Sequence, residues 1–341
     1  MIEYNLEQIW SSLEAEAVSE GTVGCRKYRR LDLDCERGIR LGYVMPERIL
    51  EMLIQISIKE EDVDIVAPNW KGMRFEIIAL DIPEEHSKHI RLFLINLEYK
   101  SIFINVCTDL VKSLNKLHTA EKRKKEIETF LWRWSRFFER YGNGGLTPEK
   151  QQGLLGELWW LQCLINFNID KYSAVSAWKG CSRDYYDFEL EGNIVEVKTT
   201  KTKEPRKVVI NNENQLDDQD GESLHLFVLT LRKLNDGGVS LPGLVNQIRT
   251  SLVGYETAES AFEHSLIDAG YLDMHASDYS IEYIVKKEEL FVVKHGFPRL
   301  VQIPSGLGDL KYSLMVSACK NFEIDRDIYL KELLKIINDN S

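Results

Sequence analysis

The sequence lacks several features that would place it in a familiar class. Its six cysteines lie far apart and no two form a CxxC pair, so neither a zinc site nor a redox motif is indicated. No apolar run approaches the roughly 18 residues of a membrane span, and the first ten residues lack the basic and then apolar pattern of a leader. We therefore expect a cytoplasmic protein with reduced cysteines and no membrane contact.

An excess of positive charge is also missing. The formal net charge is -11 over 341 residues, which argues against a protein that coats nucleic acid non-specifically. Any contact with nucleic acid must therefore be local. The hydrophobic share of 44% is that of a globular protein and suffices for one large domain or two modest ones.

The chain divides into three expected parts. Residues 1–108 read as a short helix followed mainly by strands, among them "GIRLGYVMP" and "SIFINVC", which predicts a β-rich N-terminal domain. Residues 109–142 have apolar side chains at helical spacing and predict a helical connector. In "GNGGLTPEK" the glycines end one helix, and Thr147 and Pro148 begin the next, so a second domain is expected over 143–341.

The second domain begins with a helix that is apolar almost all round and is therefore expected inside a core. The pattern after it predicts short strands at 174–178, 186–190, 194–200 and 207–210, and a longer one at 223–234. Helices fit 242–253, 256–269 and 325–338, and strands fit within 279–303. This order predicts an α/β (α+β) domain with a mixed sheet.

The segment "GNIVEVKTTKTKEPRK" places a carboxylate and an amine side by side on one predicted strand. Side chains alternate along a strand, so Glu196 and Lys198 share a face. The preceding "DYYDFEL" suggests a hairpin whose two-residue turn is Gly192 and Asn193. In that register Glu189 opposes Glu196, and Asp187 opposes Lys198.

Four ionisable groups would then converge, and this is unfavourable unless a cation compensates the carboxylates. Mg²⁺ prefers oxygen ligands and commonly binds one or two carboxylates, which Asp187 and Glu196 can supply. Lys198 can orient or deprotonate a water molecule, or stabilise negative charge on a phosphate. Two alternatives are left for Glu189: it binds the metal directly, or it lies outside the residues that bind the metal.

These motifs resemble a known superfamily. Asp187 followed by Glu196-Val197-Lys198, behind a helix that has Glu157 in "GLLGELWWL", resembles the PD-(D/E)xK nucleases. With "RRLDL", "FLWRWSRFF", "YYDFEL" and "IVEVKTT" in this order, the chain resembles the prokaryotic PD-(D/E)xK motif proteins of DNA-modification and phage-defence genes. Tyr186 stands where the motif has proline.

The resemblance implies a restriction-endonuclease-like core of order αβββαβ, with the aspartate on its second strand and the E-x-K motif on its third. It implies a Mg²⁺-dependent DNA endonuclease of restriction or phage-defence type, in which Mn²⁺ substitutes for Mg²⁺. Asp187, Glu196 and Glu157 would hold the metal, and Lys198 would complete the catalytic set. A homodimer, or a defence-system ATPase or methyltransferase, is the protein partner that it suggests.

A basic run follows the E-x-K motif. Lys201, Lys203, Arg206 and Lys207 stand against Glu204 alone and are expected to bind DNA phosphates. Gln215 follows closely and can reach nucleotides. The alternative is a solvated loop.

Interpretations without catalysis also fit these residues. Glu196 and Lys198 can form an ordinary ion pair on a solvated sheet. Glu157 can cap a backbone or pair with Arg183. The chain as a whole can be a catalytically inactive nuclease-fold module that binds DNA or a partner in a defence complex. An RNA nuclease, in contrast, would share the chemistry of the DNA enzyme.

Overall fold

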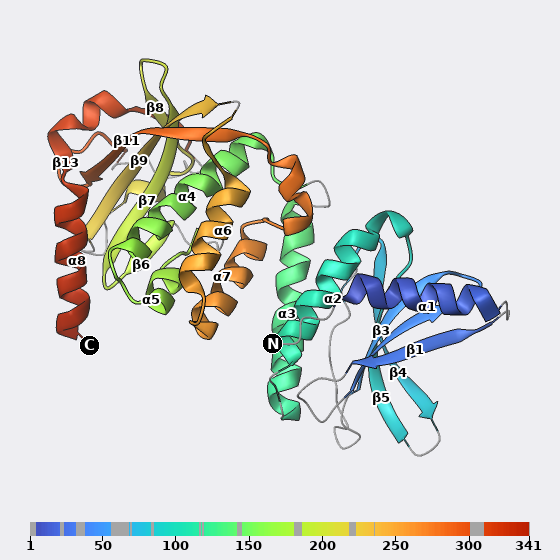
Figure 1. Cartoon of the computed structure of the whole chain (residues 1–341). Helices are drawn as coiled ribbons and strands as arrows, with labels where there is room; N and C mark the ends of the chain where they lie inside the picture. Colours follow the sequence, from blue (N-terminus) through green and yellow to red (C-terminus); the bar gives the residue numbers. More distant parts are fainter. Residues whose placement is uncertain are drawn as a thin grey trace. The chain divides into compact units, whose positions relative to one another are not determined.

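A computed structural model describes residues 5–20, 24–31, 38–55, 68, 70–82, 85–115, 117, 119–141, 145–180, 186–217, 223–234, 236–300 and 310–340. The chain forms two compact units, Met1–Gly144 and Gly145–Ser341 (Figure 1). Within the described ranges, no helix is both long enough and apolar enough to cross a membrane.

The first unit contains a five-stranded antiparallel sheet of order β1-β2-β3-β5-β4. Its elements are α1 (Leu6–Glu20), β1 (Arg26–Leu31), β2 (Ile39–Val44), β3 (Ile49–Gln55), β4 (Met73–Ile82), β5 (Glu85–Leu94), η1 (Leu97–Tyr99), α2 (Lys100–Leu114) and α3 (Ala120–Tyr141).

One face of this sheet is apolar because every second strand residue is apolar. Leu41, Met52, Leu92 and Phe75 lie opposite one another across four strands and are buried. Helix α1 lies on this face, where Trp10 Nε1 donates to the carbonyl of Gly42 at 3.1 Å. The core of the first unit therefore lies between the sheet and its helices.

The prediction of a strand at "SIFINVC" is wrong, because these residues belong to the helix α2. The buried side chains of α2 recur every three or four residues, which suits a helix and not a strand: Ile102, Phe103, Val106, Cys107, Leu110, Val111 and Leu114. The expected domain boundary at residue 108 thus falls inside a helix. The segment expected as a connector, 109–142, supplies the end of α2 and all of α3 to the first unit.

The second unit alternates helices and strands. Its elements are α4 (Pro148–Asn166), α5 (Lys171–Ser176), β6 (Phe188–Leu190), β7 (Asn193–Lys201), β8 (Lys207–Ile210), η2 (Glu213–Leu216), β9 (Ser223–Leu234), β10 (Val239–Ser240), α6 (Leu241–Leu252), α7 (Glu256–Asp268), η3 (Asp273–Asp278), β11 (Glu282–Val292), β12 (Tyr312–Met315), η4 (Val316–Phe322), β13 (Glu323–Ile324) and α8 (Arg326–Asn340). The helices expected at 242–253, 256–269 and 325–338 are confirmed as α6, α7 and α8.

The main sheet has the order β10-β11-β9-β7-β6, and β13 pairs with β11. Strand β7 runs parallel to β9, and the other neighbours are antiparallel, so the sheet is mixed. Along the chain, α4, β6, β7, β9, α6 and β11 follow in the order αβββαβ, with the remaining elements as additions (Figure 1). The mixed-sheet α+β fold expected from the sequence is confirmed.

The strand expected at 174–178 is wrong, because residues 171–176 form the short helix α5. Asp170 caps this helix, and its Oδ2 accepts a hydrogen bond from Ser173 N at 2.8 Å. The first strand of the main sheet along the chain is consequently β6, and not a strand at 174–178 as expected. Asp187 precedes its first strand, β6, and the E-x-K motif lies on its second strand, β7.

A buried histidine connects the main sheet to α8. His225 on β9 is 4% exposed, and its ring lies 4.5 Å from that of Tyr329, centroid to centroid. Among the described residues its Nδ1 has no hydrogen-bond partner. Burial lowers the pKa of His225 from its ordinary value of 6.5, since a charged imidazole would lose its hydration there.

Acid is therefore expected to destabilise the second unit through His225. Because its folded pKa lies below its unfolded pKa, the unfolded chain binds more protons below about pH 6.5, and the free energy of unfolding falls there. His225→Phe should reduce this loss in urea titrations between about pH 5 and pH 7.5. His295→Phe, which alters an exposed histidine, is the control. Equal pH dependence in both variants would contradict the expectation.

Candidate active site

Strand β7 presents Glu196 and Lys198 on one face, as the alternation of its residues predicts. Glu196 lies beside Leu226 of β9, and Lys198 lies beside Val228. Both neighbours are buried and apolar, so the carboxylate of Glu196 is 0% exposed. The opposite face of β7 packs against α4, and a Cβ built on Gly156 of α4 would lie 2.4 Å from Thr199 Cγ2.

The hairpin before β7 differs from its expected register by two residues. Its turn consists of Glu191 and Gly192, both with positive φ angles (48° and 70°), and not of Gly192 and Asn193. This is the backbone of a type I′ turn, in which glycine occupies the second central position. Glu189 therefore lies opposite Ile194 and not opposite Glu196. A shift of two preserves which side chains share a face.

Asp187 comes directly before β6, beside the part of β7 that extends beyond its pairing with β6. Its backbone carbonyl accepts hydrogen bonds from Lys179 N (2.8 Å) and Gly180 N (3.1 Å). Its Oδ2 accepts one from Val197 N at 2.8 Å, so the side chain takes the position of a strand carbonyl beside β7. This bond fixes the carboxylate next to the backbone between Glu196 and Lys198.

Glu157 reaches the same region from α4. Its Oε2 accepts a hydrogen bond from Trp178 Nε1 at 2.8 Å. A Cβ built on Gly180 would lie 2.4 Å from Glu157 Oε2 and 3.2 Å from Asp187 Oδ1. The missing side chain of Gly180 therefore lets both carboxylates approach this point.

The three carboxyl groups resist ionisation in this setting. Burial, followed by the charge of Asp187, raises the pKa of Glu196 to about 8. The same two causes raise the pKa of Glu157, and burial raises the pKa of Asp187. A cation held between these groups would remove both the repulsion and much of the cost of burial.

Lys198 supplies part of that compensation. Its Nζ pairs with Glu196 Oε1. Burial would lower the pKa of Lys198, but the negative charges of Glu196 and Asp187 outweigh it and raise the pKa. In the described part of the chain, the second oxygen of Glu196, Oε2, is buried without a hydrogen-bond partner. An unpaired buried carboxylate oxygen is costly and suits a ligand atom.

The donors fit Mg²⁺ in kind. All are carboxylate oxygens, and Mg²⁺ is commonly held by one or two carboxylates together with water. As the described side chains stand, no three of the types histidine, cysteine, aspartate and glutamate lie close enough together to hold an ion. The three carboxylates can therefore bind one ion together only after their side chains move, whereas a site of the kind common for Mg²⁺ needs only one or two of them.

The other candidate residues lie near this group but differ in their contacts. Glu189 is exposed, whereas Asp187 hydrogen-bonds to β7. Arg183, considered above as a partner of Glu157, lies outside the described residues. Gln215 Oε1 accepts a hydrogen bond from Asn211 N at 2.8 Å and thereby closes the turn around η2.

The basic run after β7 divides into exposed and anchored side chains. Lys201, Lys203 and Lys207 are exposed. Arg206 instead pairs with the buried Glu289 and donates to Thr230 Oγ1 at 3.0 Å. Arg206 thus attaches the loop to the main sheet.

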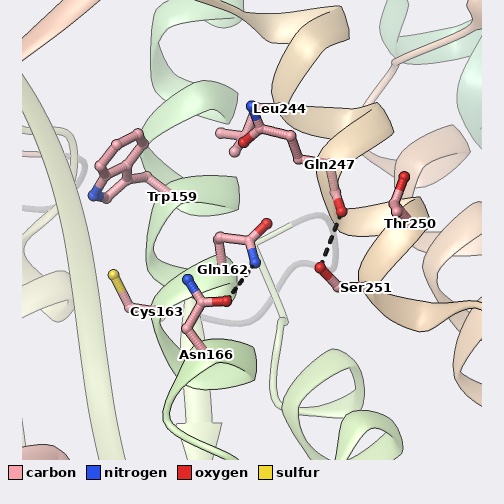
Figure 2. Close-up of a pocket in the computed structure, with 8 residues that line it drawn as sticks. All are labelled: Trp159, Gln162, Cys163, Asn166, Leu244, Gln247, Thr250 and Ser251. Atoms are coloured by element: carbon pink, nitrogen blue, oxygen red, sulfur yellow. Dashed lines mark hydrogen bonds between the residues drawn. The ribbon is translucent and has the colours of Figure 1, made fainter.

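A separate groove of about 440 Å³ lies between α4 and α6 (Figure 2). Gln162 Nε2 donates to Asn166 Oδ1 at 2.9 Å along one side of it. None of its lining residues is charged: Trp159, Gln162, Cys163, Asn166, Leu244, Gln247, Thr250 and Ser251. The groove includes none of the carboxylates described above and does not suit a phosphate.

Two residues near the carboxylates were not predicted from the sequence. Trp178 orients Glu157, and Gly180 leaves room for Glu157 and Asp187. Both lie in "AWKGC", which has no motif spacing of its own. Only the spatial approach of α4 to this segment shows their importance.

Comparison with known proteins gives one match. No curated protein and no solved structure matches the chain. A family model described as "Putative PD-(D/E)XK family member" (DUF4420) matches residues 6–317, which is most of the 341 residues. The chain therefore belongs to the DUF4420 family, whose description agrees with the resemblance that its Asp187 and Glu196-Val197-Lys198 motif suggests.

Proposed function

We propose that the second unit is a Mg²⁺-dependent endonuclease that hydrolyses phosphodiester bonds of DNA. The observation that supports this most directly is the group formed by the buried Glu196 with the half-buried Asp187 and Lys198, in which Glu196 Oε2 lacks a partner among the described residues. Such a group is costly for stability alone and useful for binding a cation and a phosphate. The proposal includes the restriction or phage-defence role and the partners suggested by the resemblance.

Asp187 and Glu196 would hold Mg²⁺, with Glu157 as a third or water-mediated donor. The ion, or Mn²⁺ in its place, supplies a positive charge that neutralises the negative charge developing on the phosphate. Asp187 is suited to this role because its Oδ2 is fixed by Val197 N while Oδ1 faces Gly180. Trp178 holds Glu157 in its orientation.

Lys198 would act on the attacking water and on the phosphate. Its amine lies beside Glu196, and its side chain is 13% exposed, which would let a substrate phosphate approach from the solvent side. Lys201, Lys203 and Lys207 would contact phosphates further along the DNA. Arg206 would hold the loop that carries Lys201 and Lys203 and would not itself contact DNA, because its guanidinium is engaged by Glu289 and Thr230.

A cleavage assay tests the proposal. The full chain is incubated with supercoiled plasmid, linear duplex, single-stranded DNA and RNA, each with Mg²⁺, Mn²⁺ or EDTA. We expect plasmid nicking or linearisation with either metal and none with EDTA. Intact plasmid under all conditions would refute the activity of the chain alone. Preferential cleavage of RNA would show that the substrate is RNA and not DNA.

One observation favours the second candidate, a non-cleaving nuclease-fold module. The ion pair between Lys198 Nζ and Glu196 Oε1 occupies one oxygen of the expected metal ligand. Titration with Mn²⁺, followed by electron paramagnetic resonance, separates the candidates. Binding that is lost in Asp187→Asn supports the nuclease, and the absence of Mn²⁺ binding by the unmodified chain supports the module.

A further inference from the structure

The edge strand β1, "RKYRRL", distributes its basic residues over two faces of the first unit's sheet. Lys27 and Arg29 point towards α1, where Lys27 Nζ pairs with Glu20 at 2.6 Å and Arg29 Nη2 pairs with Glu16 at 2.5 Å. Their charges are therefore matched by the helix. Arg26 and Arg30 lie on the other face, since side chains alternate along the strand.

Two rows of side chains cross that second face. The strand register gives one row as Tyr28, Gly42, Glu51, Phe93 and Arg74, and the next as Arg30, Arg40, Leu53, Arg91 and Glu76. Arg26 extends the face at the edge. Arg26, Arg30 and Arg74 are exposed, and Tyr28 is 38% exposed. We call this surface the arginine face.

The middle of the arginine face is held by a buried carboxylate. Glu51 is 0% exposed and accepts hydrogen bonds from Tyr28 Oη at 2.6 Å and Arg91 Nε at 2.5 Å. A Cβ at position 42 would lie 2.6 Å from the Tyr28 ring, so Gly42 lets this ring lie across the sheet. Arg91 also pairs with Glu76 at 2.9 Å. Both glutamates are thus engaged by one arginine.

The described side chains of the arginine face have an excess of positive charge. Five arginines (26, 30, 40, 74 and 91) stand against Glu51 and Glu76, which leaves +3 in a chain of net charge -11. Arg40 is the cross-strand partner of Arg30, and its Nη1 lies 3.4 Å from His89 Nε2 within the sheet. The exposed Arg26, Arg30 and Arg74 are therefore the residues of this face that suit a ligand of opposite charge.

We propose that the arginine face binds the phosphate backbone of duplex DNA. Exposed guanidinium groups form paired hydrogen bonds with phosphate oxygens, and a duplex supplies a negative charge about every 1.7 Å along its axis. A broad sheet face with separated arginines matches such an extended polyanion. The choice of DNA rests on the proposed function, whereas the binding face rests on the first unit alone.

Two matched double variants test the arginine face. Arg26→Gln with Arg30→Gln removes two charges from it, and Lys27→Gln with Arg29→Gln removes two charges from the opposite face of the same strand. Binding of the full chain to a labelled DNA duplex is measured by fluorescence anisotropy in EDTA, where cleavage does not interfere. Circular dichroism verifies that both variants are folded.

The two variants should differ in their dependence on salt. Each phosphate contact contributes about 0.9 to the slope of log affinity against log salt, so the Arg26 and Arg30 variant should have a slope shallower by about 2. Between about 50 and 200 mM salt, the affinity ratio of unmodified to variant chain should then change about tenfold. The Lys27 and Arg29 variant should keep the original slope.

Equal slopes in the two variants, or no DNA binding by the unmodified chain, would overturn the proposal. Competition by polyglutamate as effective as that of DNA at equal charge would also overturn it, in favour of an acidic protein partner. A chain that binds through this face but does not cut DNA supports the arginine face and refutes nuclease activity of the chain alone. If the chain cuts DNA and the Arg26 and Arg30 variant binds DNA as tightly as the unmodified chain, the nuclease is supported and the arginine face is refuted.

Discussion

Replacing Glu196 by glutamine, or Asp187 by asparagine, should lower Mg²⁺-dependent DNA cleavage by at least about 10²–10³-fold. Each change keeps the size of the side chain and removes one negative charge from the group that would hold the ion. Burial raises the pKa of both carboxyl groups, so neutral replacements should be tolerated by the fold. We expect both variants to unfold at or above the temperature of the unmodified chain.

Glu189→Gln is the matched control for these variants. It makes the same chemical change on β6, two residues from Asp187, at an exposed position paired with Ile194. Its initial rate of plasmid nicking should equal that of the unmodified chain. If Glu189→Gln were inactive while Asp187→Asn remained active, Glu189 would be the ligand and the present assignment would be wrong.

Gly180→Ala should reduce cleavage and Mn²⁺ affinity by about 10–100-fold, the loss typical when residues that orient metal ligands are changed. The added methyl group would lie 2.4 Å from Glu157 Oε2 and 3.2 Å from Asp187 Oδ1, so at least one carboxylate must move. Titration of the variant with Mn²⁺ and measurement of nicking rates report the two effects separately.

Gly153→Ala provides the control for that glycine change. Gly153 lies on α4, four residues before Glu157, and a Cβ there would meet no described atom within 4 Å. Alanine is preferred over glycine inside a helix by about 1 kcal/mol, so this variant should be more stable and equally active. Equal loss of activity in both variants would show that the helix, and not the space beside Gly180, is sensitive.

The alternation of side chains along a strand correctly predicted the parts of the site that depend on local sequence. Alternation along residues 194–199 correctly placed Glu196 and Lys198 on one face of β7. The expected hairpin was out of register by two residues, yet Asp187 still came beside β7, because an even shift preserves the faces. The turn was placed one residue too late because Gly192 and Asn193 both tolerate positive φ angles, whereas the positive φ angles are those of Glu191 and Gly192.

The errors occurred where long-range packing decides local structure. Residues 101–107 have the β-branched and aromatic content of a strand, but they form the first half of an amphipathic helix whose apolar stripe continues to Leu114. Residues 174–178 were expected as a strand, yet the cap at Asp170 begins a helix that covers residues 171–176. Likewise, the run after β7 gave no sign that Arg206 would pair with Glu289, which lies 83 residues away.

The hydrogen bond from Val197 N to Asp187 Oδ2 couples two processes. The same carboxylate that would coordinate an ion also fastens the segment before β6 to the neighbouring strand. Occupancy of the metal site should therefore be linked to backbone rigidity, and amide protons of the hairpin around Glu191 should exchange more slowly with deuterium once the ion is bound.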